Sequence, residues 1–511
     1  MRRRSFRTFF ISVLASAWMV GLCPLPAGPA QAMAPPHVVT STGALAGQAT
    51  GQGGALFLGI PFAQPPVGRL RWEPPQPLTW TGVREATHPS PPCLQAPYGW
   101  NDALAARSQE DCLYLDIRTP AMTPAKALPV MVWIHGGANR AGGADGTVLS
   151  NLADQGVVLV ALQYRLGAFG FLSLSELTAE SPHHASGNYA LMDQMAALAW
   201  VRRNIALFGG DPDNITIFGE SAGGQDVGQL MLAPEARGLF AKAIAQSGTA
   251  GFGVPPRSLA ENETLGQQVL DAAGVQTLAQ LRALSGADIL AATDTLKPST
   301  IADDSFIWLQ AVVDGWVLPK APEDLLADAA PVPLMIGSLA RELTLYGGPD
   351  AVVPTIHRAF GPKAPQALAF YGVKDGIAPA PDPRLGDVAT QLADDLTFRC
   401  PSLHVAAAQA ARHIPTWVYH FDRSPAKGPV THGSDLPFLF SGLPAGAPGD
   451  ATPTVQRYWI NFARSGDPNG KGLVHWPAFG PKGGYLAFTD AGPQAKSRLR
   501  GPLCDLRPPM P

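Results

Sequence analysis

The chain has 511 residues, of which 46% are hydrophobic and 15% charged, and its formal net charge at pH 7 is −3. This composition is typical of a folded globular protein and excludes a disordered or fibrous chain. Because the chain is mildly acidic and has no long basic stripe, nothing in its charge favours binding to nucleic acid.

Residues 1–32 have the pattern of a signal peptide. Four arginines precede an apolar run over residues 9–22, and the sequence Ala30-Gln31-Ala32 offers the small residues that a signal peptidase cuts. The apolar run is shorter than the roughly 20 residues of a comfortable membrane span. We therefore expect an exported protein, periplasmic or secreted, without a stable membrane span after cleavage. The arginine pair at residues 3–4 leaves both the general secretory and the twin-arginine route open.

The remaining residues, 33–511, are expected to form a single domain. Residues 35–120 are rich in Pro and Gly between short apolar runs, which predicts a small antiparallel sheet. Apolar runs then alternate with helical spacings along the chain. Strands are expected at 128–134, 156–164, 215–218, 241–246, 334–337 and 416–421, helices at 188–208 and 222–232, a mainly helical stretch at 258–330, and surface loops at 374–384 and 441–453. Such alternation predicts an α/β fold with a large, mostly parallel sheet and helices on both faces.

A pattern of chemical interest follows the strand expected at 215–218. Residues 219–223 read Gly-Glu-Ser-Ala-Gly, which matches G-x-S-x-G with Ser221 at its centre. A strand that runs straight into this pattern and a helix that follows it predict a nucleophile elbow, which exposes the serine hydroxyl on a strained turn. We therefore take Ser221 as a nucleophile, with a serine in an ordinary surface turn as the alternative.

A second glycine pair follows the strand expected at 128–134, in the segment His135-Gly136-Gly137-Ala138. Successive glycines let the backbone approach a substrate closely with its N–H groups exposed. We expect the backbone N–H groups of Gly137, Ala138 and Ala222 to form an oxyanion hole. The alternative is an ordinary Gly-Gly turn.

With these motifs in place, the chain resembles the type-B carboxylesterase and cholinesterase family, which has the α/β-hydrolase fold. The matching segments are EDCLYL at 110–115, HGGA at 135–138, FGGDP at 208–212, FGESAGG at 218–224 and QSG at 246–248. The resemblance spans nearly all of the expected mature chain. It implies a serine hydrolase of carboxylic esters that forms an acyl-enzyme and needs no cofactor and no metal.

The same resemblance implies the acid of a catalytic triad. The family carries a glutamate five residues after a glycine that ends a strand, and here Glu342 follows Gly337 at that spacing. The family has a glycine after this acid, whereas this chain has Leu343. Asp304 and Asp350 remain as alternatives for the acid.

The family histidine opens a pattern that His432 matches, in His-Gly-Ser-Asp-Leu-Pro-Phe at 432–438. His432 follows the strand expected at 416–421, whereas His420 lies within it and is expected to be packed. The order Ser221, Glu342, His432 is the chain order of α/β-hydrolase triads. The resemblance also places three polar residues beside the triad, namely Glu220, Ser247 and Asp435.

Four cysteines remain after signal removal, which for an exported protein indicates two disulfides in one of three pairings. The resemblance implies the pairs Cys93–Cys112 and Cys400–Cys504.

Residues that could contact substrate are less well marked. Trp100 lies near the place where cholinesterases carry a choline-stacking tryptophan, and beside Glu220 it would favour an aromatic or cationic alcohol group. The alternative is a tryptophan packed on the first disulfide loop. By position, Leu345 and Tyr346 are candidates for the acyl side. Asn139 stands where the family has an aromatic residue, and it would contact the acyl group or bond its own loop.

These observations favour a hydrolase of small, apolar or aromatic esters, with the ester as its small-molecule partner. Two alternatives stay open. An acyl transferase would use the same acyl-enzyme with an alcohol in place of water. An inactive binding module would have the same fold without the chemistry.

Overall fold

Apolar runs along the chain become the strands of one large sheet. This computed structural model describes residues 34–144, 146–294, 296, 307–308, 310–424, 428–440 and 452–507. The expected signal peptide and most of the expected loop at 441–453 lie outside the described residues. The strands of the sheet are β3 (Gln48–Thr50), β4 (Gly54–Pro61), β6 (Tyr114–Thr119), β7 (Leu128–Ile134), β8 (Val158–Leu162), β9 (Gly210–Glu220), β10 (Lys242–Gln246), β13 (Leu334–Leu339), β14 (Thr416–Asp422), β15 (Gly484–Thr489) and β16 (Gly492–Ser497).

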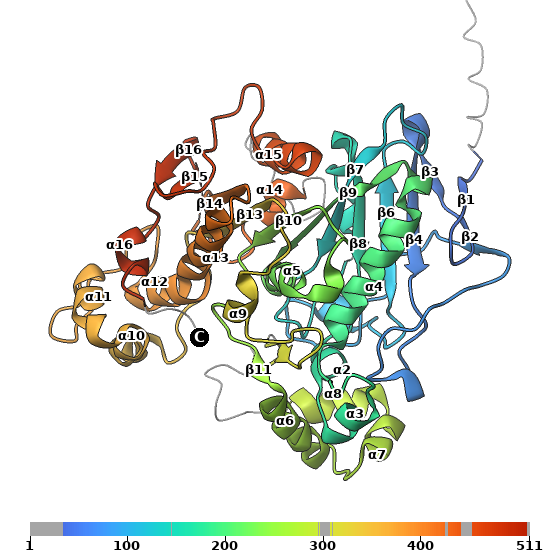
Figure 1. The fold of residues 1–511 in the computed structure, drawn as a ribbon, viewed down its shortest axis with the longest axis horizontal. Coiled ribbons are helices and arrows are strands. Elements are labelled where there is room, and N and C mark those ends of the chain that lie inside the picture. The colour runs from blue at the N-terminus through green and yellow to red at the C-terminus, as the bar shows by residue number, and fades with distance from the viewer. Residues whose placement is uncertain are drawn as a thin grey trace, which may run out of the picture. The chain divides into compact units, whose positions relative to one another are not determined.

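The described strands pair in the order β16-β15-β14-β13-β10-β9-β7-β8-β6-β4-β3, which makes an 11-stranded sheet (Figure 1). From β8 through β7, β9, β10, β13 and β14 to β15, neighbouring strands are parallel. The pairs at the two ends are antiparallel. The predicted α/β fold with a mostly parallel sheet is therefore confirmed, and β9, which leads to Ser221, lies in its middle.

The segment at 35–120 departs in detail from the predicted small antiparallel sheet. A separate three-stranded sheet contains β1 (His37–Val39), β2 (Ala44–Ala46) and β5 (Val83–Glu85), and its β2–β5 pair is parallel. Strands β3, β4 and β6 instead extend the large sheet. The reason is burial, because seven of the eight residues of β4 are buried, so this strand needs cover on both faces.

The helices cover both faces of the sheet. They are α1 (Asp102–Ala105), α2 (Gly167–Phe171), α3 (Ser175–Glu180), α4 (Tyr189–Asn204), α5 (Ala222–Leu232), α6 (Leu259–Ala272), α7 (Leu278–Ala283), α8 (Gly286–Asp294), α9 (Pro322–Leu326), α10 (Val352–Phe360), α11 (Ala364–Phe370), α12 (Val388–Asp394), α13 (Cys400–Ala411), α14 (Leu436–Leu439), α15 (Thr452–Ser465) and α16 (Gly501–Cys504). Alternate residues of β7 point to opposite faces. Val130 and Val132 belong to the core that contains the apolar side chains of α4 and α5. Met131 and Trp133 belong to the core that contains those of α15.

Two segments differ from the predicted helices. The helix predicted at 188–208 ends at Asn204 and continues as a 3-10 turn over Ile205–Phe208. The stretch at 258–330 is mainly helical, but it also contains the short parallel strands β11 (Arg257–Ser258) and β12 (Val312–Val313). Helices α10, α11 and α12 were not predicted. Together with Leu503 of α16 their side chains form a third apolar cluster, and Figure 1 shows these helices near one another.

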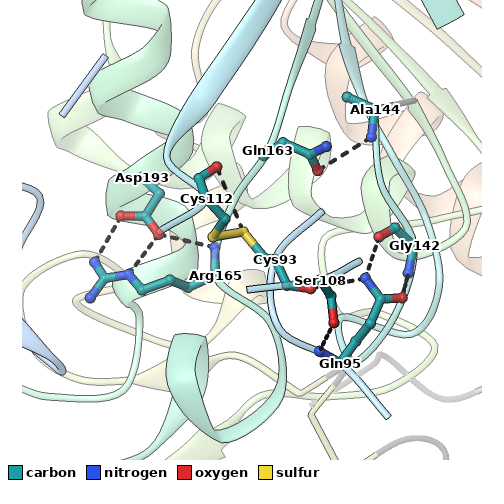
Figure 2. The surroundings of a disulfide bond; sticks show 9 residues. All are labelled: Cys93, Gln95, Ser108, Cys112, Gly142, Ala144, Gln163, Arg165 and Asp193. Atoms are coloured by element: carbon teal, nitrogen blue, oxygen red, sulfur yellow. Dashed lines mark hydrogen bonds and ion pairs between the residues drawn. A yellow bond between two sulfur atoms is a disulfide. The ribbon is translucent and has the colours of Figure 1, made fainter. Parts of the chain in front are cut away.

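Two disulfides join cysteines in the pairing that the resemblance implies, Cys93–Cys112 and Cys400–Cys504. Figure 2 shows the first of them, and beside it the Gln95 side-chain amide that reaches Gly142. This amide donates to Gly142 O at 2.7 Å and accepts from Gly142 N at 2.8 Å. The disulfide loop at 93–112 is thereby tied to the loop that follows β7.

Candidate active site

Ser221 lies between the end of β9 and the start of α5. Its φ of 58° with a ψ of −124° is a backbone conformation that non-glycine residues rarely adopt, and such strain persists only where the surroundings enforce it. The surroundings are close here, because a Cβ on Gly219 would lie 2.5 Å from Gly223 O, and one on Gly223 would lie 2.1 Å from Ile134 O. Glycine is therefore required on both sides of the serine, and the local geometry is that of a nucleophile elbow.

Glu342 and His432 follow the carboxyl ends of two further parallel strands, β13 and β14. His432 Nδ1 lies 2.7 Å from Glu342 Oε2, and because a carboxylate only accepts, Nδ1 carries the proton of this bond. Asp350 is exposed in the 3-10 turn Gly348–Ala351, and Asp304 lies outside the described residues. Of the acids considered from the sequence, Glu342 is the one placed against the histidine.

The other Glu342 oxygen is held from two sides. Oε1 accepts hydrogen bonds from Ser247 Oγ at 2.9 Å and from Leu339 N at 2.6 Å. Asp435 has different partners, since its Oδ2 accepts from Gln246 Nε2 at 2.8 Å. Ser247 thus contacts the glutamate directly, whereas Asp435 bonds Gln246 and, at 3.3 Å, the Tyr419 hydroxyl.

A further carboxylate behind Glu342 was not found from the sequence. Asp394 Oδ1 accepts from the backbone N–H of Glu342 at 3.1 Å and of Leu343 at 2.9 Å. Its Oδ2 lies 3.2 Å from Arg399 Nη2. Burial raises the pKa of Asp394 to about 8, against the opposing effect of Arg399. No spacing in the sequence marks this residue, because it acts on backbone groups of a distant segment.

Both ring nitrogens of His432 face carboxylates. Nε2 lies 3.3 Å from Glu220 Oε1, on the side opposite to Glu342. Burial lowers the pKa of His432, but Glu220 and Glu342 raise it more strongly, so the net shift is upward from 6.5. Burial raises the pKa of Glu220 to about 7, with His432 opposing the shift. The protonated imidazole is therefore favoured by its surroundings.

The loop after β7 lies directly against the serine turn. A Cβ on Gly136 would lie 2.5 Å from Glu220 O and 3.0 Å from Ser221 Cβ. Gly137 has a φ of 115° and Ala138 a φ of 54°. Among the described residues, none accepts a hydrogen bond from the backbone N–H of Gly137, Ala138 or Ala222. Three backbone donors are thus left available beside Ser221.

Ser221 and His432 line one cavity of about 660 Å³. Its other walls are largely apolar and aromatic, and they include Trp100, Leu104, Trp133, Leu436 and Phe440. Glu220 also lines it. A volume of this size fits a small organic molecule.

Of Trp100, Leu345 and Tyr346, the candidates for substrate contact, only Trp100 lines this cavity. Trp100 lines the cavity and its side chain is 64% exposed, so it does not simply pack on the first disulfide loop. Leu345 packs instead against the apolar cluster of α10 to α12, and Tyr346 is 67% exposed; neither lines the cavity.

Asn139 also differs from the expectation. Its side chain is fully buried and does not line the cavity. Asn139 Nδ2 donates to Asp226 Oδ1 on α5 at 3.1 Å, so this amide bonds a distant helix and not its own loop backbone. The sequence could not show this, since the two residues are 87 positions apart.

The described residues offer no group of three or more His, Cys, Asp or Glu side chains that could hold a metal ion. None of the described helices is long and apolar enough to cross a membrane.

A serine on a strand–turn–helix elbow, beside a histidine–carboxylate pair at the carboxyl ends of parallel strands, defines the α/β-hydrolase class.

Comparisons with known proteins agree with this class. The profile of the carboxylesterase family matches residues 34–348 and 379–506. The chain is 37% identical to a liver carboxylesterase of Sus scrofa over 92% of both chains. It is 36% identical to carboxylesterase 1E of Mus musculus over 94% of this chain and 95% of that protein.

Solved structures give the same result. A carboxylesterase of Geobacillus stearothermophilus aligns with a TM-score of 0.79 and 32% identity, over 92% of this chain and 100% of that one. A structure titled PNB esterase aligns with a TM-score of 0.78 and 32% identity, over 93% of this chain and 99% of that one. The chain belongs to the carboxylesterase family, whose members are serine hydrolases of carboxylic esters.

Proposed function

We propose that this carboxylesterase hydrolyses small, apolar or aromatic esters through an acyl-enzyme on Ser221. The observation that carries the proposal is the 2.7 Å contact of Glu342 Oε2 with His432 Nδ1, at a histidine that lines the same cavity as Ser221. This arrangement has the elements of a triad, which are a nucleophile, a base and a group that orients the base.

In the proposed reaction, His432 Nε2 takes the Ser221 proton as Oγ attacks the ester carbonyl. Glu342 holds the imidazole with its proton on Nδ1 and stabilises the imidazolium. The N–H groups of Gly137 and Ala138, with that of Ala222, bind the tetrahedral oxyanion. His432 returns the proton to the leaving alcohol. The same histidine then activates the water that releases the acid.

The cavity supports the proposed substrate class. Its walls are mainly apolar, so burial of hydrocarbon groups of the ester contributes to binding. Trp100 offers an aromatic surface for the alcohol group. Glu220 is a carboxylate of the cavity wall, but its Oε1 is already engaged by His432 Nε2 at 3.3 Å, which makes it less available to a cationic substrate. We therefore place apolar and aromatic esters ahead of cationic ones.

The test of the proposal is Ser221→Ala, assayed with p-nitrophenyl acetate and p-nitrophenyl butyrate. We expect kcat to fall by at least about 10⁴-fold, because the nucleophile is lost. Circular dichroism should show an unchanged fold, and a fluorophosphonate probe should label the wild type but not the variant. Hydrolysis by the variant at close to the wild-type rate would refute the mechanism.

We also propose that the protein is exported and that residues 33–511 act as one domain. Two disulfides support export, because such bonds persist in oxidising compartments. Residues 35–511 group into one compact unit. Mass spectrometry of the secreted or periplasmic protein should find an N-terminus at residue 33.

A further inference from the structure

A buried polar network lies behind the proposed oxyanion hole. It connects the loop after β7, which carries Gly137 and Ala138, with helix α5, which begins at Ala222. The link is the hydrogen bond from Asn139 Nδ2 to Asp226 Oδ1, at 3.1 Å. Both side chains are fully buried, so water does not compete for this bond.

Asp226 has a second donor within the core. Its Oδ2 accepts from Gln194 Nε2 of helix α4 at 2.6 Å. Among the described residues, the carboxylate therefore accepts hydrogen bonds from two neutral amides. Burial raises the pKa of Asp226 to about 7, while these two hydrogen bonds oppose the shift. Burial of a carboxyl group without a charged partner lowers the stability of the fold, so its presence here points to a functional role.

Asn139 is held at two further points. Its side-chain Oδ1 lies 3.2 Å from the hydroxyl of Tyr164, which also donates to His135 O at 2.6 Å. Its backbone O accepts from Gly167 N at 2.7 Å. The loop needs this restraint, because Gly137, Ala138 and Asn139 all have positive φ values. A positive φ is strained for an alanine such as Ala138, because its Cβ then crowds the backbone, so the surroundings must hold it in place.

From these contacts we infer that Asn139 and Asp226 are positioning residues that fix the spacing between the two halves of the oxyanion hole. One half is on the loop and the other is the first N–H of α5, and the Asn139–Asp226 bond joins the elements that carry them. An oxyanion gains most from donors that are already placed, since small displacements weaken each bond. This inference rests on the oxyanion hole of the proposed function.

Two single variants remove one side of the bond each. Asn139→Gly deletes the amide while keeping a residue that tolerates the positive φ, so backbone strain does not confuse the result. Asp226→Leu deletes the acceptor while keeping the same number of side-chain heavy atoms. We expect each variant to lower kcat for p-nitrophenyl butyrate about tenfold or more, with KM within about threefold.

The affinity for a trifluoromethyl ketone separates positioning from a merely structural role. This inhibitor adds to a serine nucleophile and carries an oxyanion like that of the tetrahedral intermediate. Its affinity should fall by the same factor as kcat/KM in both variants. The double variant should lose no more activity and inhibitor affinity than the more impaired of the two single variants, because both changes break the same bond.

Asp226→Asn is the conservative variant. Its Oδ1 can accept from Asn139, and its new amide can donate to Gln194 Oε1, which has no partner among the described residues and is reached by turning the Gln194 amide over. We expect kcat within about threefold of wild type. The matched control is Asn204→Ala, which removes a buried amide from the end of α4, where it bonds Ser41 and Trp200. It should lower the melting temperature without changing kcat or inhibitor affinity by more than twofold.

Wild-type kcat and inhibitor affinity in folded Asn139→Gly would overturn the inference. So would a double variant whose loss equals the product of the two single losses. If Asp226→Leu does not fold, Asn139→Gly and Asp226→Asn still decide the matter. Failure of the proposed function itself is recognised separately, as activity retained in Ser221→Ala.

Discussion

At the scale of single residues, the charges around His432 determine the protonation state of this proposed base. Glu342 is placed on Nδ1 and Glu220 on Nε2, so the imidazolium lies between two carboxylates. The sequence shows that Glu220 precedes Ser221, but it does not show which way the side chain turns. In the structure Glu220 Oε1 lies 3.3 Å from His432 Nε2, and this adds a second anion that stabilises the protonated form.

The pH dependence of hydrolysis follows from this geometry. A base whose pKa is raised stays protonated to higher pH, so kcat/KM should fall on the acid side at a midpoint above the ordinary histidine value of about 6.5. Replacement of Glu220 by Gln removes the anion on Nε2 and should move this midpoint down by about one to three pH units. The measurement is kcat/KM for an uncharged ester from pH 4 to 10.

Glu235→Gln is the control for the loss of one negative charge, because Glu235 is exposed. Its profile should coincide with that of the wild type. If the Glu220→Gln midpoint stays where it is in the wild type, Glu220 does not determine the protonation of the base.

At the scale of elements, the sequence predicted the parallel strands well. Strands such as β7 and β8 are buried on both faces and therefore read as unbroken apolar runs. Strand β16 gives no such signal, since most of its residues are exposed. Helix α15 has the helical spacing of Val455, Tyr458 and Phe462 in one buried core, a signal that could have placed it.

The two disulfides belong to different elements of the site and should have different effects. Cys93 and Cys112 close the loop that carries Trp100, and Gln95 of that loop bonds Gly142. Replacing both cysteines by Ala should lower the free energy of unfolding by about 3 kcal/mol. It should raise KM more than it lowers kcat, because the triad is anchored elsewhere. Thermal unfolding and steady-state kinetics measure the two effects.

The Cys400–Cys504 pair provides the comparison. Its sequence separation is 104, so its removal should cost more, about 4 to 5 kcal/mol. Cys400 follows Arg399, which contacts Asp394 behind Glu342, and kcat should therefore change more than KM. Equal effects of both double variants on KM would contradict the assignment of the first loop to substrate binding.

For the whole molecule, the sequence could predict the fold and the candidate triad but not the supports of the triad. Ser221 stands in a local pattern, and His432 and Glu342 stand in family patterns, so each is visible in a few neighbouring residues. Asp394 and Asp226 act across 52 and 87 positions, on a backbone and on a single side chain. Such contacts depend on how elements pack, and no short pattern encodes them.

These buried acids also determine how stability of the whole molecule depends on pH. Burial raises the pKa of Asp116 and Asp435 to about 6, of Glu220 and Asp226 to about 7, and of Asp394 to about 8. An acid that binds its proton more tightly in the folded chain stabilises the fold fully below about pH 4. This stabilisation is lost as the pH rises through the folded value.

Histidines oppose this trend only in acid. Burial lowers the pKa of His135 to about 4 and of His420 to about 3. Both are therefore neutral in either state above about pH 6.5, and their effect is a loss of stability as the pH falls below that value. Between pH 6.5 and 8 the raised acids act in the same direction as His432, whose raised pKa also gives a stabilisation that is lost as the pH rises above about 6.5, so the melting temperature should fall across this range.

Asp116→Asn tests this account on one acid away from the cavity. Asp116 Oδ1 accepts from Gly59 N at 2.7 Å and from Ser90 Oγ at 2.6 Å, and the carbonyl oxygen of Asn can take both bonds. Because the pKa is raised from 3.8 to about 6, the wild type should lose about 2 kcal/mol through this group as the pH rises from 4 to 6. The variant should not lose this stabilisation.

The melting temperature of Asp116→Asn relative to wild type should thus be higher at pH 7.5 than at pH 4.5. The exposed-acid control Asp213→Asn should show the same difference from wild type at both pH values. An Asp116→Asn difference that is independent of pH would show that burial of this carboxyl is not what sets the slope.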